Sequence, residues 1–287
     1  MNWLICAVGV LVFSPMMYLF VRYAKQYKIR LEVQNFYMYF IPTFGYLLYN
    51  LVMRYSFKID FIYVIIIVLD SIFLSYLGNV FSLKGMNNAP NAGYSLMITK
   101  SNAIMTTTLS VFLFGASFGF KNIIAIIIVI SFMFLILVEK KESELKSDKK
   151  PWILYTFIAF FAFGFQALIM TYLGKQGIPS SVSLFYLMLT VLSITIVELF
   201  IKKIKVGFDK NSIKVMIGIG IGSTLFNIFL ILGYISAPNA GFMNAVSAGS
   251  VALLTIIYSF IFKDNLNKRK LIGIVGVLIG LLILLVL

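Results

Sequence analysis

The chain of 287 residues is 61% hydrophobic and only 12% charged, whereas soluble proteins are about half apolar and a quarter charged. A soluble protein of this size has no interior large enough for so many apolar side chains, but a bilayer lets them face outward. The net charge of +14 comes mostly from lysines and arginines in short connecting segments, a pattern typical of membrane topology signals and not of a nucleic-acid-binding face. We expect an integral membrane protein that contacts lipid and no nucleic acid.

Several kinds of chemistry are excluded by composition. The chain has no histidine, and its one cysteine, Cys6, falls within the first apolar segment. Disulfide frameworks, histidine- or cysteine-based metal sites and Ser-His-Asp catalysis are therefore not expected. The sequence also lacks a Walker-type phosphate loop, so we expect no direct use of ATP and no cofactor, beyond a coupling proton or cation.

Ten apolar segments are long enough to cross a bilayer, which takes about 20 helical residues. The stretch 215–262 has no charge over its 48 residues and would measure about 72 Å as one helix, so it must fold back. Ser236–Gly241, with proline, asparagine and glycine, supplies the turn. The predicted spans cover approximately residues 3–21, 33–52, 61–83, 91–114, 122–138, 152–173, 180–201, 213–235, 239–262 and 271–287.

Orientation follows from the basic residues of the loops. Most of the 24 lysines and arginines lie in the loops after the first, third, fifth, seventh and ninth spans. Cytoplasmic loops are the ones enriched in these residues. The sequence thus predicts a multi-pass protein of the plasma (inner) membrane with both termini outside.

The chain repeats itself at an offset of 148 residues. Ala89–Gly93 and Ala237–Gly241 both read Ala-Pro-Asn-Ala-Gly, and near the N-terminus an offset of 149 pairs Trp3 with Trp152. Each copy holds five predicted helices, an odd number, so the two copies must cross the membrane in opposite senses. We predict an all-α fold of ten transmembrane helices in two inverted repeats, residues 1–138 and 152–287, joined by a cytoplasmic linker, 139–151. Further matches at offset 148 are Asn79 with Asn227, Phe81 with Phe229, Gly85 with Gly233, Thr107 with Thr255, Phe112 with Phe260 and Phe114 with Phe262.

This arrangement resembles the drug/metabolite transporter superfamily, and in particular its EamA-like branch. In the second repeat, Ala237–Gly241 leads through a small-residue segment to Phe262-Lys263-Asp264 and then to a glycine-containing last segment. The sequence departs from the family pattern at Asn265, where a basic residue usually follows the acidic one, and at Gly115–Gly119, the equivalent turn of the first repeat. The resemblance implies a transporter whose first, third, fourth, sixth, eighth and ninth helices line a central cavity.

Polar residues on these lining helices are the candidate substrate ligands. On the fourth span Ser95, Thr99, Asn102 and Thr106 share one helical face. Such residues also let membrane helices approach and bond to each other, so a binding role and a packing role both stay open, and a symmetric interhelical hydrogen bond explains the paired asparagines equally well. The other candidates are Asn79, Gln166, Asn227, Asn244 and Ser247.

Two ionisable residues, Asp70 and Lys100, lie deep inside predicted spans. Facing lipid, each would cost about 2.5–3.5 kcal/mol, so each needs a partner or a wet cavity. Lys100 can bind a substrate carboxylate, and Asp70 a coupling proton or cation. A structural salt bridge between them, or a lysine that extends to the interface, explains them as well. Glu198, close to Lys202, is expected at the interface.

The function predicted from these features is secondary transport of a small amino-acid-like or other amphipathic metabolite by alternating access. Export is the direction that the family resemblance implies. A lipid-carrier flippase on the same fold is the alternative, and a membrane-embedded enzyme is disfavoured because acid-base residues are so few. No catalytic residue is expected, and the oligomeric state stays open.

Overall fold

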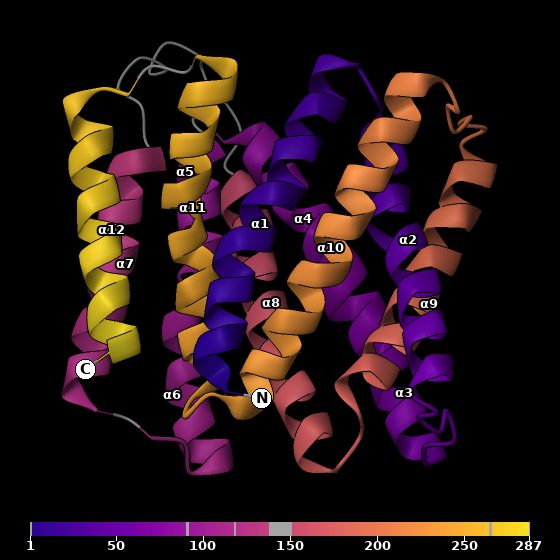
Figure 1. Cartoon of the computed structure of the whole chain (residues 1–287), viewed down its shortest axis with the longest axis horizontal. Coiled ribbons are helices and arrows are strands. Elements are labelled where there is room, and N and C mark those ends of the chain that lie inside the picture. Colours follow the sequence, from indigo (N-terminus) through magenta and orange to yellow (C-terminus); the bar gives the residue numbers. More distant parts are fainter. Residues whose placement is uncertain (1, 90–91, 118, 138–150, 264–265, 287) are drawn as a thin grey trace.

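The computed structural model describes residues 2–89, 92–117, 119–137, 151–263 and 266–286. Within these ranges the chain is built of helices, with no β-strand, joined by short loops (Figure 1). The helices are α1 (Trp3–Gln26), α2 (Leu31–Val52), α3 (Phe61–Leu69), the π-helix η1 (Asp70–Tyr76), α4 (Leu77–Asn88), α5 (Ala92–Lys100), α6 (Asn102–Phe114), α7 (Phe120–Leu137), α8 (Pro151–Lys175), α9 (Ser180–Ile201), α10 (Lys210–Ser236), α11 (Ala240–Phe262) and α12 (Lys268–Val286).

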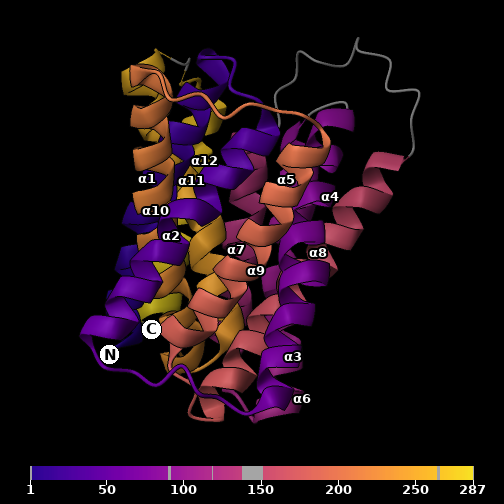
Figure 2. The same cartoon turned by 90° about the vertical axis from the view of Figure 1, so that its right-hand side faces the viewer.

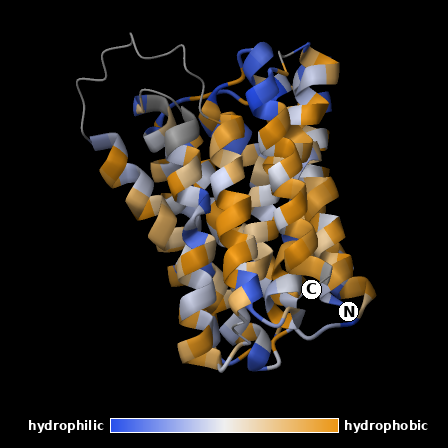
Figure 3. Ribbon diagram, turned by 90° about the vertical axis from the view of Figure 1, so that its left-hand side faces the viewer, coloured by the Kyte–Doolittle hydropathy of each residue, from blue (hydrophilic) through white to orange (hydrophobic). Residues whose placement is uncertain are grey.

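Long apolar helices dominate the described residues. Seven helical runs among them are long and apolar enough to cross a membrane: α1, the run Phe61–Met86, α7, α8, α9, α10 and α11. The outward side chains fit this environment, since Phe61, Phe112, Phe200 and Phe260 are each at least 78% exposed. Apolar residues run along the middle of the bundle, and hydrophilic residues gather mainly at its ends (Figure 3). The protein is a multi-pass, all-α membrane protein.

Two of the predicted spans are not regular α-helices. The predicted span 61–83 contains the π-helix η1, and the predicted span 91–114 is divided between α5 and α6 by a turn at Ser101. The predicted linker 139–151 lies outside the described residues except for Pro151. Pro90 and Asn91 of the first Ala-Pro-Asn-Ala-Gly segment, and Asp264 and Asn265 of the second repeat, lie outside them too.

Helices distant in sequence pack side by side. α1 lies along α10, α2 along α9, α4 along α8 and α12 along α7, and α11 lies between α1 and the pair α7–α12 (Figures 1 and 2). Both chain ends lie at the same end of the bundle, the lower one in Figure 1, while the α9–α10 loop lies at the opposite end (Figure 1). Because the core is made between the two halves of the chain, neither half buries its apolar faces alone.

An ion-pair network joins α2 to α9 at the end of the bundle that holds the α9–α10 loop. The ammonium of Lys202 lies 2.7 Å from Glu198 and 3.3 Å from Glu32. The hydrogen bond from Lys202 to Glu198 raises the pKa of the lysine, so the network stays charged at neutral pH. Glu198, expected at the interface, also accepts from the hydroxyl of Tyr76 at 3.1 Å.

Basic residues end three helices in the left-handed conformation. Lys28 (φ 55°), Arg54 (φ 55°) and Lys203 (φ 51°) follow α1, α2 and α9. The amide after each of them donates to a carbonyl five residues back, which is the bonding of a Schellman motif, normally made with glycine. A cation at this position is favoured by the negative end of the helix dipole.

The closest helix approach involves a glycine of the second Ala-Pro-Asn-Ala-Gly segment. A Cβ on Gly241 would lie 2.4 Å from the backbone nitrogen of Thr107 and 2.6 Å from its Cα. Asn239 secures the same contact, because its side-chain amide donates to the Thr107 carbonyl at 3.0 Å. This contact fixes how α11 meets α6, where the candidate site lies.

We predict that Gly241→Ala destabilises the protein by about 1–3 kcal/mol, the usual cost of overpacking, because the added methyl group meets backbone that cannot rotate away. Thermal unfolding of the purified protein in detergent measures the change. Gly119→Ala is the matched control, since its Cβ would have no neighbour closer than 3.8 Å. Equal melting temperatures for the two variants would contradict the packing described here.

Candidate functional site

The break between α5 and α6 lies among buried residues. α5 ends at Lys100 and α6 begins at Asn102, and the hydroxyl of Ser101 between them donates to the Met97 carbonyl at 2.8 Å. A broken membrane helix brings the amides of one segment and the carbonyls of the other to one place, which transporters use to bind solutes and ions. The sequence predicted polar residues here but did not predict the break.

Lys100 reaches from this break to α11, where its Nζ donates to the Ser247 hydroxyl at 3.0 Å. Ser250 continues the contact, with its hydroxyl 2.7 Å from the Ser247 carbonyl and 2.8 Å from the hydroxyl of Ser14 on α1. Among the described residues no carboxylate forms an ion pair with Lys100. An ammonium group has three donors, so Lys100 can bind an anionic group in addition to the serine.

Two predicted ligands flank this lysine in the chain. Thr99 is 2% exposed, and its hydroxyl has no hydrogen-bond partner in the described part of the chain. Asn102 is buried in the first turn of α6. A buried hydroxyl without a partner costs free energy, so Thr99 is a second polar group at the break that a bound solute can satisfy.

Asn244 joins three helices. Its side-chain oxygen accepts from the hydroxyl of Tyr234 on α10 at 2.6 Å, and its nitrogen donates to Thr106 on α6 at 3.0 Å. Both ends of the amide are therefore used in packing, although Asn244 was predicted to bind substrate. Tyr234 was not predicted, because nothing in the sequence separates it from the other 15 tyrosines.

The paired asparagines do not make equivalent bonds. Asn79 on α4 donates to the Asn35 side chain on α2 at 3.0 Å. Asn227 donates to the carbonyl and hydroxyl of Ser223, 2.8 and 3.2 Å away in its own helix. The symmetric interhelical hydrogen bond is thus wrong for Asn227, because Ser223 offers an acceptor one turn away.

Asp70, the first residue of η1, is 1% exposed. Neither carboxylate oxygen has a hydrogen-bond partner among the described residues. Its electrostatic neighbours are the half-buried Gln166 of α8, also a predicted ligand, and Tyr234 of α10. The expected salt bridge between Asp70 and Lys100 is not formed, since the lysine bonds to Ser247.

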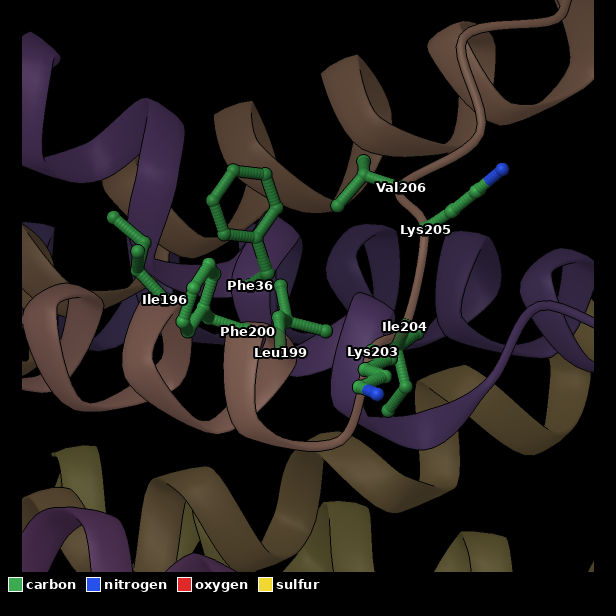
Figure 4. A pocket seen from close by; sticks show the side chains of 8 residues that line it. All are labelled: Phe36, Ile196, Leu199, Phe200, Lys203, Ile204, Lys205 and Val206. Carbon is green, nitrogen blue, oxygen red and sulfur yellow. The ribbon is translucent and has the colours of Figure 1, made fainter.

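A groove at the end of α9 is a different kind of surface. Phe36 lies over the helix, and Lys203 and Lys205 extend at its edge (Figure 4). Phe200 in its wall is 84% exposed, so the groove opens outward to the surroundings of the bundle. None of the predicted ligands lines it; its other residues are Ile196, Leu199, Ile204 and Val206.

The comparisons with known proteins bear on the fold. No family model matches the sequence, and no curated protein does. Among solved structures 28 chains match. One of them, described only as "Crystal structure of protein", has a TM-score of 0.81 and 9% identity over 98% of this chain and 96% of its own. This likeness shows the fold alone.

We predict that Asn244→Ala destabilises the protein by about 1–3 kcal/mol, because it leaves Tyr234 and Thr106 buried with a lost partner each. Asn227→Ala is the control, since its bonds lie within α10 and its loss should cost less. Thermal unfolding in detergent compares the two. Equal losses, or a larger loss at Asn227, would show that Asn244 does not hold the three helices together.

Proposed function

We propose that this protein is a secondary transporter that moves a small amphipathic solute with a carboxylate or similar anionic group by alternating access. The observation that carries the proposal is Lys100, a cation at a helix break inside the bundle whose described partner is a neutral serine. A lysine in such a place without a carboxylate partner marks a solute pathway in many membrane proteins.

The helix boundaries support two repeats. α2 and α9 begin 149 residues apart and end 149 residues apart, and α3 and α10 also begin 149 residues apart. From the end of α4 onward the offset is 148: α4 and α10, and α6 and α11, end that far apart, and α5 and α11, and α7 and α12, begin that far apart. Ten helical passes in two inverted sets of five are the simplest arrangement with this spacing.

The residues with positive φ support the same alignment. Lys28 pairs with Gly177 and Arg54 with Lys203 at offset 149, and Gly115 pairs with Lys263 at offset 148. These three pairs include all the positive-φ residues of the described chain. Equivalent helices therefore end in the same left-handed turn, even where the residue types differ.

The packing supports an approximate two-fold relation. The contact of α1 with α10 has its counterpart in the contact of α8 with α4, and the contact of α1 with α11 in that of α8 with α5 and α6. α2 with α9, α6 with α11, and α7 with α12 are contacts of a helix with its own equivalent. Inverted repeats of this kind exchange conformations to open a central site to alternate sides.

The polar groups that would bind a solute come from both repeats but differ between them. Lys100 corresponds to Ala248 and Thr99 to Ser247 at offset 148, so the first repeat provides the cation and the second provides a hydroxyl that bonds to it. Lys100 would hold the anionic group, with Thr99 and Asn102 beside it. An apolar part of the solute fits the surrounding helix faces.

Under this proposal the chain is a ten-helix member of the drug/metabolite transporter superfamily, the family that its sequence resembles. It would lie in the plasma membrane with the basic loops inside, both termini outside and residues 139–151 as a cytoplasmic linker. Export would be its direction.

Transport in proteoliposomes tests the proposal. A ¹⁴C-labelled mixture of the common amino acids should exchange across the membrane, whereas the corresponding decarboxylated amines should exchange poorly. Lys100→Ala should lower the exchange about 10- to 100-fold, because it removes a charged hydrogen bond of about 1.5–3 kcal/mol. Lys100→Arg should retain part of it.

Lys205→Ala, an exposed lysine of the α9–α10 loop, is the matched control and should exchange solute as the wild type does. Full activity of Lys100→Ala would contradict the assignment of the site. Movement of a fluorescent phospholipid without movement of any amino acid would replace the proposal with the flippase.

A further inference from the structure

The third predicted span contains a one-residue insertion, and it lies at Asp70. A π-helical turn holds more residues than an α-helical turn, so a short π-helix shifts the register of the helix that follows. The offset between the two halves is 149 up to the start of α3 and 148 from the end of α4, and η1 is the segment between them. Its equivalent in the second half, α10, is continuous from Lys210 to Ser236.

A serine side chain accompanies the π-helical turn. The Ser71 hydroxyl donates to the Ile67 carbonyl at 2.6 Å. In an α-helix the usual partner of this carbonyl is the Ser71 amide, which a π-helix pairs with the residue before it. Single π turns are frequent at functional sites, and this one begins with the acidic residue.

The carboxylate has no equivalent in the second half. The position that corresponds to Asp70 is Gly218 or Ile219, depending on which offset is used. Both residues are buried, and a Cβ on Gly218 would meet the ring of Phe20 at 2.3 Å. Both the inserted residue and the acid thus belong to one half of an otherwise repeated structure, as expected of a feature kept for function and not for packing.

The surroundings of Asp70 carry no compensating charge. Gln166 from α8 and Tyr234 from α10 are the side chains of the described chain that interact with it. On the other helices packed against η1, Glu198 of α9 bonds to Tyr76 and Lys202, and Lys84 of α4 lies over aromatic rings. An ionised carboxylate buried without a partner is so unfavourable that it takes up a proton instead.

A metal cation fits this place less well. A hard cation takes six or more oxygen ligands, whereas the described residues around Asp70 offer its own two unpartnered oxygens and one amide. No group of three His, Cys, Asp or Glu side chains that could hold a metal occurs in the described ranges.

We propose that Asp70 takes up a proton from one side of the membrane and releases it to the other, and that this proton drives transport at the Lys100 site. The inference rests on the proposed function. No bond other than the O–H of the acid forms or breaks.

A chain of contacts joins the two sites. Tyr234, the electrostatic neighbour of Asp70, donates to Asn244, and Asn244 donates to Thr106 on the helix that follows Lys100. Asn244 and Ser247, the partner of Lys100, lie one turn apart on α11. Loss of the proton leaves a charge that needs water, so ionised Asp70 favours an open conformation and neutral Asp70 favours the occluded one described here.

Proteoliposomes that contain the pH dye pyranine test the coupling. In the wild type, an imposed pH gradient should drive uphill accumulation of the ¹⁴C-labelled amino-acid mixture, and an amino-acid gradient should move protons. Asp70→Asn should abolish both effects while solute exchange at equal pH continues. Asp60→Asn, at the exposed start of α3, is the matched control and should remain coupled.

The outcomes separate the two proposals. Solute exchange without proton movement in the wild type, or accumulation that follows a sodium gradient and ignores pH, overturns the role of Asp70 and leaves the transporter standing. Absence of solute exchange in the wild type overturns the transporter itself. If Asp70→Asn does not fold, Asp70→Glu serves instead: it should remain coupled with a shifted pH profile of accumulation, and an unchanged profile overturns the proposal.

Discussion

A charged group inside an apolar helix bundle must be paired, hydrated or neutralised, and this requirement shapes the centre of the protein. The charges near the α9–α10 loop meet it in an ordinary way, as Lys202 does with Glu198 and Glu32. Asp70 and Lys100 do not meet it through each other or through another ion pair of the described residues. Each lies at an irregularity of its own helix, the π-helix η1 and the break at Ser101. The irregular backbone and the unpaired charge therefore occur together.

Asymmetry on a repeated scaffold is the second theme. The helix ends and the left-handed caps recur at a constant spacing on each side of η1, so the scaffold is duplicated nearly residue by residue. Asp70 and Lys100 have no charged equivalents, since the second half has glycine or isoleucine and alanine there. A symmetric scaffold can exchange two conformations of similar free energy, and the added charges can then make that exchange depend on solute and proton.

Hydropathy predicts much of this fold, and its limits have physical causes. The predicted spans coincide with helical runs because long apolar segments in a bilayer have no other way to satisfy their backbone. The π-helix was not predicted, although the sequence carried its signal: Trp3 pairs with Trp152 at offset 149, while Asn79 pairs with Asn227 at 148. The bonds of Asn244 to Tyr234 and Thr106 could not be predicted, because they depend on which faces of three helices meet.

Alternating access by two inverted repeats is the central claim, and distances between spin labels test it most directly. In a Cys6→Ser background, one label pair would occupy Gln26 and Asn88, the ends of α1 and α4. The equivalent pair in the other repeat would occupy Lys175 and Ser236, the ends of α8 and α10. When solute is added or the pH is changed, one distance should shorten while the other lengthens. Two distances that stay constant, or that change in the same direction, would contradict the account.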